Sequence, residues 1–185
     1  MEIIPAALPD ILIIKPDVYP DKRGYFMETY HSEKYSHQGI PAAFVQDNQA
    51  MSPRNVIRGL HYQIEYPQGK LIRVLSGEIF DVAVDIRKGS PTFGRWHGEY
   101  LTNANLHQMY VPVGFAHGYC VLSDTAEIFY KCTNLYHPEH DRGILWNDPD
   151  IGIEWPVTTP VLSEKDANQP CLRNAPQFDY FGGYL

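Results

Sequence analysis

Three basic side chains stand close together near the middle of the sequence, and their types suit a negatively charged ligand. Arg58 and His61 share a predicted strand over 56–63, and Lys70 begins the next predicted strand. Taken alone, His61 would more commonly be a core histidine satisfied by a hydrogen bond. Burying an arginine, a histidine and a lysine together without a ligand would be costly, so we interpret them as a site for an anion or an enolate-like species.

The eight histidines invite a metal-site interpretation, which the sequence supports only in part. A His-x-His pair would need a second histidine two residues after His61, but that position holds Gln63, a poor metal ligand. His117, which ends the segment 112–117, could supply a further ligand from a later strand. We therefore expect no metal at this position. The remaining histidines stand in polar or turn contexts and are expected at the surface: His31, His37, His97, His107, His137 and His140.

Length and composition indicate one domain over residues 1–185 with a substantial core. The 13 tyrosines and 8 phenylalanines favour strands. With 15 basic and 22 acidic residues the formal net charge is −7, so the broad basic surface that nucleic-acid binding requires is missing. A phosphate group on the ligand must be met by a local cluster of Arg and Lys.

The three cysteines, Cys120, Cys132 and Cys171, form no CxxC pair, which argues against a disulfide framework and a zinc knuckle. The N-terminal segment has no basic region followed by a small-residue cleavage site, and no stretch is long and apolar enough to cross a membrane. We expect a cytoplasmic protein without membrane contacts.

The elements that must position these residues are mostly strands. In 80–86, apolar residues alternate with Asp81, Ala83 and Asp85, which predicts a half-buried strand, joined by a hairpin around Gly77 to a strand before it. Further strands are predicted over 11–16, 25–30, 56–63, 99–101, 108–111, 118–122 and 126–133. Short helices are expected at 32–37 and after Ser163. Strands at such intervals predict an all-β sandwich or barrel.

An ordered set of motifs resembles the dTDP-4-dehydrorhamnose 3,5-epimerase family. The motifs are DxRGYFxE at 21–28, FVQDN at 44–48, RGLHYQ at 58–63, QGKLIRV at 68–74, FDVAVD at 80–85, GFAHG at 114–118, YK at 130–131, WNDP at 146–149 and LSEKD at 162–166. Each motif is weak by itself, whereas the ordered set is specific. The resemblance implies a double-sheet jelly roll of the cupin type with a few short helices. It also implies a homodimeric, cofactor-free enzyme that inverts C3 and C5 of dTDP-4-dehydro-6-deoxy-D-glucose to give dTDP-4-dehydro-L-rhamnose.

This resemblance assigns catalytic roles. A proton beside a ketone can be removed only if the enolate is stabilised, so the site needs a base, an oxyanion partner and an acid on the opposite face. The implied base is His61, oriented by Asp166, while Lys70 stabilises the enolate and Tyr130 donates the proton. Sequence alone favours a solvated helix residue for Asp166. It leaves open a strand-edge charge for Lys70 and a core tyrosine for Tyr130.

The resemblance also assigns contacts with the sugar nucleotide. Arg23 and Arg58 suit the diphosphate, and Phe26 and Tyr136 could stack on the pyrimidine. At position 141 the chain has aspartate where family members often carry glutamate, which affects fine positioning rather than the reaction. The implied binding residues are Arg23, Phe26, Glu28, Gln46, Asp47, Asn48, Arg58, His117, Tyr136, Asp141 and Lys165. The segment 23–28 is expected to cross to the partner subunit, so that the dimer shares its active sites.

Three other functions stay open at this point. The chain could epimerise only C3 or only C5, or act on a related nucleotide-linked 4-keto-6-deoxysugar, although Tyr130 argues against the narrower chemistry. A metal-dependent cupin, such as a dioxygenase or a phosphosugar isomerase, is disfavoured by Gln63. A non-catalytic sugar-binding cupin would have no need of a base, an acid and an oxyanion partner together.

Overall fold

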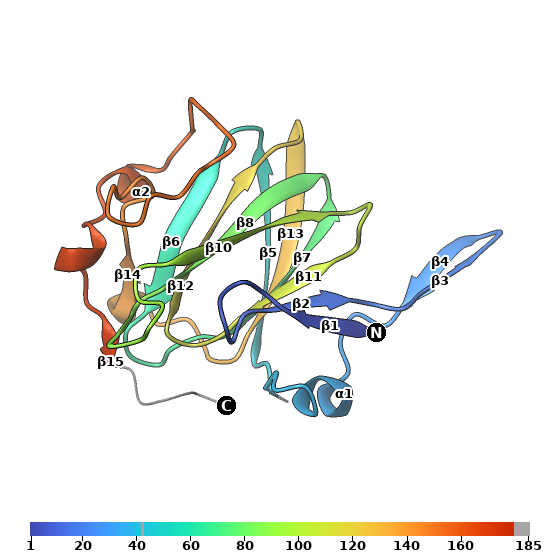
Figure 1. The fold of residues 1–185 in the computed structure, drawn as a ribbon. Coiled ribbons are helices and arrows are strands. Elements are labelled where there is room, and N and C mark those ends of the chain that lie inside the picture. Colours follow the sequence, from blue (N-terminus) through green and yellow to red (C-terminus); the bar gives the residue numbers. More distant parts are fainter. Residues whose placement is uncertain (42, 180–185) are drawn as a thin grey trace.

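Two antiparallel sheets face each other and enclose the apolar core (Figure 1). The computed structural model describes residues 1–41 and 43–179. The six-stranded sheet has the order β1 (Glu2–Pro5), β2 (Leu12–Lys15), β11 (Gln108–Val111), β7 (Lys70–Ser76), β13 (Thr125–Cys132) and β5 (Gln46–Pro53). The five-stranded sheet has the order β10 (Trp96–Thr102), β8 (Glu78–Asp85), β12 (Phe115–Val121), β6 (Ile57–Gln63) and β14 (Asp141–Gly143). The predicted all-β, double-sheet fold is confirmed.

Short elements complete the described fold. Two small strand pairs are present, β3 (Val18–Asp21) with β4 (Gly24–Met27) and β9 (Arg87–Lys88) with β15 (Phe178–Asp179). The two α-helices are α1 (Ser32–Ser36) and α2 (Glu164–Ala167), which confirms the predicted helices, and 3-10 turns occupy Pro138–His140 and Leu172–Asn174. Among the residues that the structure describes, no helix has the length and apolar character needed to cross a membrane.

Alternate residues of the facing strands build the core between the sheets. Ile72 and Val74 of β7 and Ile128 of β13 pack with Ile79 of β8 and Val121 of β12, all essentially without solvent contact. Burying an aliphatic side chain of this size contributes about 1.5–3 kcal/mol. The period-two pattern therefore holds the two sheets together.

Strand β8 is buried on both faces, so the prediction that it is half-buried is wrong. Its alternation is present, but Val82 and Val84 face outward against a second apolar cluster, which includes Ile151 and Leu172 of the C-terminal segment. That segment, drawn in orange and red in Figure 1, covers the outer face of the five-stranded sheet. Asp81 and Asp85 are also buried. Burial is tolerated because each has a basic partner, His117 for Asp81 and Arg87 for Asp85.

The predicted hairpin around Gly77 is a corner between the sheets instead. Strands β7 and β8 belong to different sheets and do not pair with each other. Gly77 has a φ of +83°, and a Cβ placed there would lie 2.2 Å from the carbonyl oxygen of Thr125. Glycine is needed at this corner because the backbone conformation and the close approach both exclude a side chain.

Six predicted strands match β2, β6, β10, β11, β12 and β13, but β5 was not predicted. Its sequence, QDNQAMSP, is too polar to give a strand signal. Pairing with β13 over the full register from Gln46–Cys132 to Pro53–Thr125 supplies the backbone hydrogen bonds that make it a strand. Similarly, the prediction over 25–30 is too long, since β4 ends at Met27.

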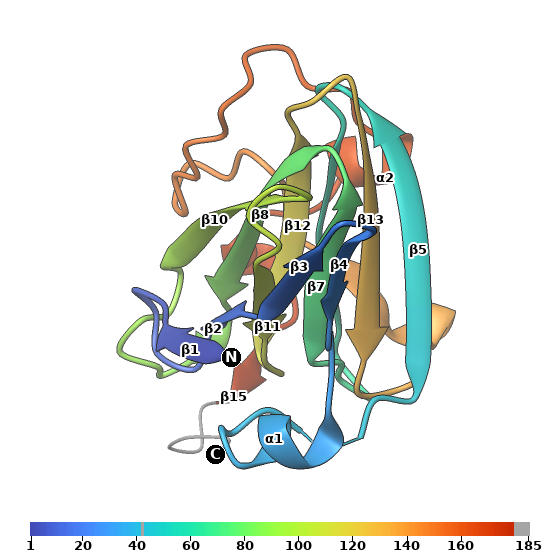
Figure 2. The same ribbon diagram turned by 90° about the vertical axis from the view of Figure 1, so that its right-hand side faces the viewer.

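The β3–β4 hairpin stands away from both sheets (Figure 1), and in the turned view of Figure 2 it points toward the viewer. It carries exposed aromatic rings at Tyr19, Tyr25 and Phe26, the last with 70% of its surface exposed. An isolated two-stranded ribbon is at best marginally stable in water, and contiguous exposed apolar side chains often mark a contact surface. The exposed rings make this hairpin a candidate contact surface.

A buried arginine fixes the end of β8. Arg87 Nε and Nη2 donate hydrogen bonds to Asp85 at 2.9 and 2.8 Å, and Nη1 donates to Asp10 at 2.8 Å. The guanidinium carbon lies 4.5 Å from the centre of the Phe115 ring, at the start of the strand that carries His117. Burial opposes ionisation of Asp85, but hydrogen bonds led by those from Arg87 hold its pKa below the usual value. Arg87 thus connects the end of β8 to the segment before β2 and to the start of β12.

Replacing Arg87 by methionine should lower the free energy of unfolding by about 3–5 kcal/mol, because the Asp85 carboxylate would stay buried without its cation. Urea unfolding of the variant and the unmodified protein measures this loss. The matched control is Arg54→Met, since Arg54 pairs with Asp124 at the surface and should contribute less than about 1 kcal/mol. Equal losses for the two variants would contradict the role assigned to Arg87.

Candidate active site

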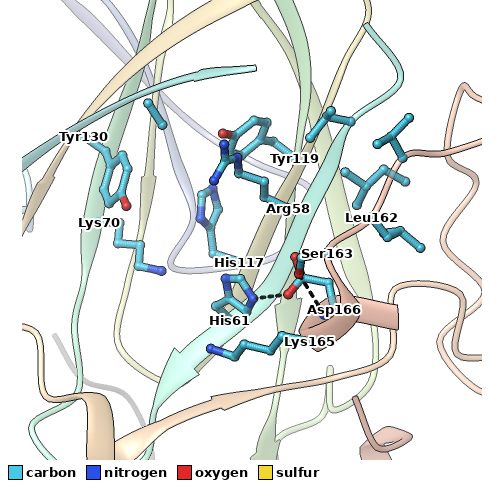
Figure 3. A pocket seen from close by; sticks show the side chains of 14 residues that line it. Arg58, His61, Lys70, His117, Tyr119, Tyr130, Leu162, Ser163, Lys165 and Asp166 are labelled. Carbon is cyan, nitrogen blue, oxygen red and sulfur yellow. Dashed lines mark hydrogen bonds and ion pairs between the residues drawn. The ribbon is translucent and has the colours of Figure 1, made fainter. Parts of the chain in front are cut away.

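A cavity of about 430 Å³ opens between the two sheets. Strands β6 and β12 of one sheet, strands β5, β7 and β13 of the other, and helix α2 supply its lining (Figure 3). A second hollow of about 360 Å³ adjoins it and shares His61, Lys70, Tyr130 and Lys165. The structure therefore brings the four predicted catalytic residues, Asp166 included, to one cleft.

His61 and Asp166 form a close pair. Nε2 of His61 lies 2.6 Å from Oδ1 of Asp166, whose side chain is only 6% exposed. Ser163 begins α2, and its hydroxyl accepts the Asp166 backbone N–H at 3.0 Å, which fixes the first turn. Asp166 is thus not the solvated residue that sequence alone favoured. Burial opposes its ionisation, but the hydrogen bond and charge of His61, together with Ser163, hold its pKa below the usual value.

Tyr130 and Lys70 lie on the opposite sheet from His61. Strands β13 and β7 pair so that Cys132 stands opposite Lys70 and Tyr130 opposite Ile72, which brings the Tyr130 and Lys70 side chains to one sheet face. Figure 3 shows both on one side of the cavity, with His61 and Asp166 on the other. The prediction that Tyr130 faces the interior is confirmed.

Burial changes the proton affinity of both groups. It raises the pKa of Tyr130 to about 12, so the hydroxyl keeps its proton at neutral pH. It lowers the pKa of Lys70, while Cys132, Asp141 and Asp81 act in the opposite direction. The half-buried Lys70 ammonium is a positive charge in a place where water screens it poorly. Such a charge is well suited to stabilise an oxyanion.

Further polar residues surround these four. Arg58 is at the mouth, where its Nε donates to the hydroxyl of the buried Ser52 at 2.9 Å. Lys165 pairs with Asp141, and the Tyr136 hydroxyl donates to the same carboxylate oxygen at 3.1 Å. Burial opposes protonation of Lys165, but its hydrogen bond to Asp141 raises the pKa above the usual value. Asp141 therefore holds two side chains at the rim of the cleft.

The predicted contacts from β5 divide between its two faces. Gln46 and Asn48 line the second hollow, and the Gln46 amide donates to the Asn48 side chain at 3.0 Å. Asp47 points the other way, is exposed, and accepts a hydrogen bond from Lys131 at 2.9 Å. Alternation along the strand thus keeps Asp47 out of the cleft.

Three other predicted binding residues lie on or beside the projecting hairpin and do not reach the cleft of this chain. The Arg23 side chain is 83% exposed and pairs with Asp21, and Phe26 is also exposed. Glu28 accepts a hydrogen bond from Lys34 at 2.7 Å. Phe26 and Glu28 instead line a separate hollow, together with Lys34 of helix α1 and His37, the residue after the helix.

Gln63 stands where a second metal ligand would be required, and its amide is fully used. Its nitrogen donates to the carbonyl oxygens of Tyr66 and Leu135 at 2.7 and 3.1 Å, and its oxygen accepts the His137 N–H at 2.6 Å. It joins β6 to the segment after β13. Within residues 1–41 and 43–179, no group of three or more His, Cys, Asp or Glu side chains is arranged to hold a metal ion.

Sequence reasoning missed Asp81, which contacts the predicted binding residue His117. His117 lines the cavity, and its Nε2 lies 2.8 Å from Oδ1 of Asp81. An aspartate that alternates with apolar residues along a strand is usually exposed to solvent. Only the pairing of its strand with the strand of His117 could have indicated this contact. Of the histidines expected at the surface, His37 is exposed, whereas five are partly buried: His31, His97, His107, His137 and His140. The His97 side chain, for example, is 14% exposed.

Comparison with known proteins identifies a family. The model of the dTDP-4-dehydrorhamnose 3,5-epimerase family matches residues 5–174. The dTDP-4-dehydrorhamnose 3,5-epimerase of Methanothermobacter thermautotrophicus is 53% identical over 178 residues, which cover 95% of this chain and 96% of that protein. The Shigella flexneri protein of the same name is 52% identical over 183 residues, or 98% and 99% of the two chains.

A solved structure agrees with this assignment. The dTDP-6-deoxy-D-glucose-3,5-epimerase of Legionella pneumophila, in complex with dTDP-4-keto-L-rhamnose, superposes with a TM-score of 0.94 at 47% identity. The match covers 97% of this chain and 98% of that one.

The environment of Lys70 gives a prediction that needs no substrate. Lys70 should lose its proton below the usual lysine pKa of about 10.4, because burial disfavours the ammonium form. NMR titration of carbon-labelled lysine side chains measures this, and a Lys70→Met variant assigns the signal. Lys165 is the internal control, since its pairing with Asp141 should move its titration to higher pH. A Lys70 signal that titrates together with or above Lys165 would contradict the burial argument.

Proposed function

The chain belongs to the dTDP-4-dehydrorhamnose 3,5-epimerase family, and from this premise we propose how the cleft carries out the reaction. The enzyme inverts C3 and C5 of dTDP-4-dehydro-6-deoxy-D-glucose, giving dTDP-4-dehydro-L-rhamnose for deoxysugar biosynthesis. The metal-dependent and non-catalytic alternatives are thereby set aside. The observation that carries the assignment of roles is that His61 and Tyr130 come from opposite sheets, with Lys70 lining the same cavity.

We propose that His61 is the base. Its Nε2–H donates to Asp166, so Nδ1 is the nitrogen left to take a proton from the carbon next to the ketone. The buried carboxylate fixes the ring in this tautomer and stabilises the imidazolium that forms. Asp166 can do this because the pairing keeps it ionised in spite of burial.

Removal of the proton leaves an enolate, whose negative charge lies mainly on O4. Lys70 would donate a hydrogen bond to that oxygen from an ammonium that water screens only weakly. Because C3 and C5 both flank C4, one lysine can serve the enolates formed at either carbon. This accounts for a single cleft acting on two centres.

Tyr130 would return a proton from the opposite face of the sugar, which inverts the centre. Its hydroxyl holds a proton at neutral pH because burial raises its pKa to about 12. Each inversion transfers one proton to His61 and removes one from Tyr130. Both groups then regain their starting state by exchange with solvent before the second centre reacts.

The rim of the cleft suits the nucleotide part of the substrate. Arg58 and Lys165 provide positive charge for the diphosphate in a protein whose net charge is negative. Gln46 and Asn48 offer amide groups on one strand face, and Tyr136 offers an exposed ring for stacking on the pyrimidine. Asp141 would position Lys165 and Tyr136 through the contacts already described.

We also propose a two-fold symmetric dimer in the cytoplasm. In it the β3–β4 hairpin would cross to the partner and bring Arg23, Phe26 and Glu28 to the partner's cleft. The exposed rings of the hairpin, and the distance of these residues from the cleft of their own chain, support this exchange. The three unpaired cysteines are compatible with a reducing compartment.

Isotope exchange separates the roles of His61 and Tyr130. In deuterated water, His61→Ala should prevent deuterium from entering at C3 and C5, because the base is missing. Tyr130→Phe should still allow exchange through His61, while inversion falls further, on the scale of about 10²–10⁴-fold for a general acid. The control is Tyr110→Phe, a buried tyrosine outside the cleft. Normal inversion by folded Tyr130→Phe, or exchange by folded His61→Ala, would refute the assignment.

Mixing inactive chains tests the shared site. Arg23→Ala and His61→Ala subunits should together recover activity, up to about one quarter of the sites under random pairing, because one site of each mixed dimer has both residues. Mixing Arg58→Ala with His61→Ala should recover nothing, since both residues belong to the cleft of the same chain. If Arg23→Ala and His61→Ala chains exchange subunits, as shown by mass, without recovering turnover, the hairpin does not complete the partner's site.

A further inference from the structure

A second carboxylate–histidine pair lies beside the first, on the neighbouring strand of the same sheet. The Nε2–H of His117 donates to Oδ1 of Asp81 at 2.8 Å, and His117 stands directly opposite His61 in the register of β12 and β6. The Asp81 side chain is 0% exposed and that of His117 is 7% exposed. Both histidines are thus held at Nε2 by a carboxylate, which leaves Nδ1 of each ring for a ligand. Both side chains line the cavity (Figure 3).

Packing does not explain an aspartate at position 81. It occupies the inner face of β8 between Ile79 and Ala83, both members of the apolar core, and its register neighbour is Tyr119. Its second oxygen, Oδ2, has no hydrogen-bond partner among the residues that the structure describes. An ionisable group in such a place is costly, and an apolar side chain of similar size would be at least as stable there.

We propose that Asp81 is a positioning residue of the active site that acts through His117. By accepting the Nε2–H it fixes the ring orientation and keeps the proton on Nε2, so that Nδ1 presents a lone pair to the substrate. The group recognised is a hydroxyl of the sugar ring, which donates to Nδ1 and is thereby held in register with His61. This inference rests on the function proposed above and adds a residue to it.

The two histidines share the same contact with a carboxylate, but their partners lie in different parts of the fold. His61 is paired with a carboxylate on a helix at the edge of the cleft, and its partner Asp166 is held by Ser163. Asp81, by contrast, lies on an interior strand of the sheet, is fully buried, and accepts the hydrogen bond from His117. One ring is therefore placed to take a proton, and the other to fix the sugar relative to it.

A double-mutant cycle tests this dependence with Asp81→Leu, His117→Ala and the combined variant. Asp81→Leu should lower kcat/KM by about 10–100-fold, the scale of loss when a carboxylate partner that orients a metal-binding histidine is removed, mainly through a higher KM. In the combined variant the loss should equal that of His117→Ala alone, because Asp81 has nothing left to act on. Losses that multiply would overturn the proposal.

Nitrogen-15 spectra of the histidine rings give a readout that does not depend on turnover. In the unmodified protein, His117 should show a protonated Nε2 and an unprotonated Nδ1, whereas in Asp81→Leu the two tautomers should mix while His61 stays unchanged. A His117 spectrum that Asp81→Leu leaves unaltered would also overturn the proposal. Failure of the unmodified protein to turn over the sugar nucleotide would count against the proposed function instead, and the ring spectra would still decide the role of Asp81.

The matched control is Asp85→Asn on the same strand. Asp85 is as fully buried as Asp81, but it pairs with Arg87 and does not line the cavity. Its replacement should lower stability while leaving the His117 spectrum and KM unchanged. A change in both by Asp85→Asn equal to that caused by Asp81→Leu would show that any buried charge on β8 acts alike, which would contradict a specific role for Asp81.

Discussion

Carboxylates that have been removed from water are the constraint on which this structure depends. Asp81, Asp85 and Asp166 are each almost without solvent contact, and each keeps a basic partner within 2.6 to 2.9 Å. Ionised groups are tolerated inside a protein only when such partners are present and well oriented. At Asp85 the partner is an arginine that joins segments of the fold. At the other two the partner is a histidine that lines the cleft, so one physical rule both joins segments of the fold and orients side chains of the cleft.

The two-sheet architecture matches the geometry of the reaction. Inverting a carbon requires a base on one face of the sugar and an acid on the other, and these must stay apart to avoid exchanging the proton directly. The base and the acid that we propose, His61 and Tyr130, belong to the five-stranded and the six-stranded sheet and lie on opposite sides of the cavity. The sheets are fixed relative to each other by the core that Ile72, Ile79 and Ile128 help to form. The fixed separation of the two sheets therefore keeps the two groups on opposite faces of the sugar.

The sequence predicted strands well where apolar and polar residues alternate, and poorly where pairing alone decides. The strand at 108–111 was located to the residue, whereas polar β5 exists because β13 lies alongside it. The family motifs brought together His61, Lys70, Tyr130 and Asp166, which line one cleft, but also included Asp47 and the hairpin residues, which do not. The burial of Asp166 and Asp81 could not be inferred from their neighbours in sequence. Burial of both depends on segments that arrive from far along the chain. For the same reason nothing local indicated that Gly77 turns between sheets.

Gln63 bears on how such a fold can change its chemistry during evolution. A histidine at this position would restore the spacing typical of metal-binding relatives of the jelly roll, yet it would release the carbonyl groups of Tyr66 and Leu135 and the N–H of His137. Each hydrogen bond of this kind contributes about 0.5–1.5 kcal/mol, so the loss of three would be destabilising. A metal ligand at this position would therefore come at the expense of the contacts that hold the segment after β13 against β6. The sequence of that segment, and not the ligand position alone, limits which side chains position 63 can carry.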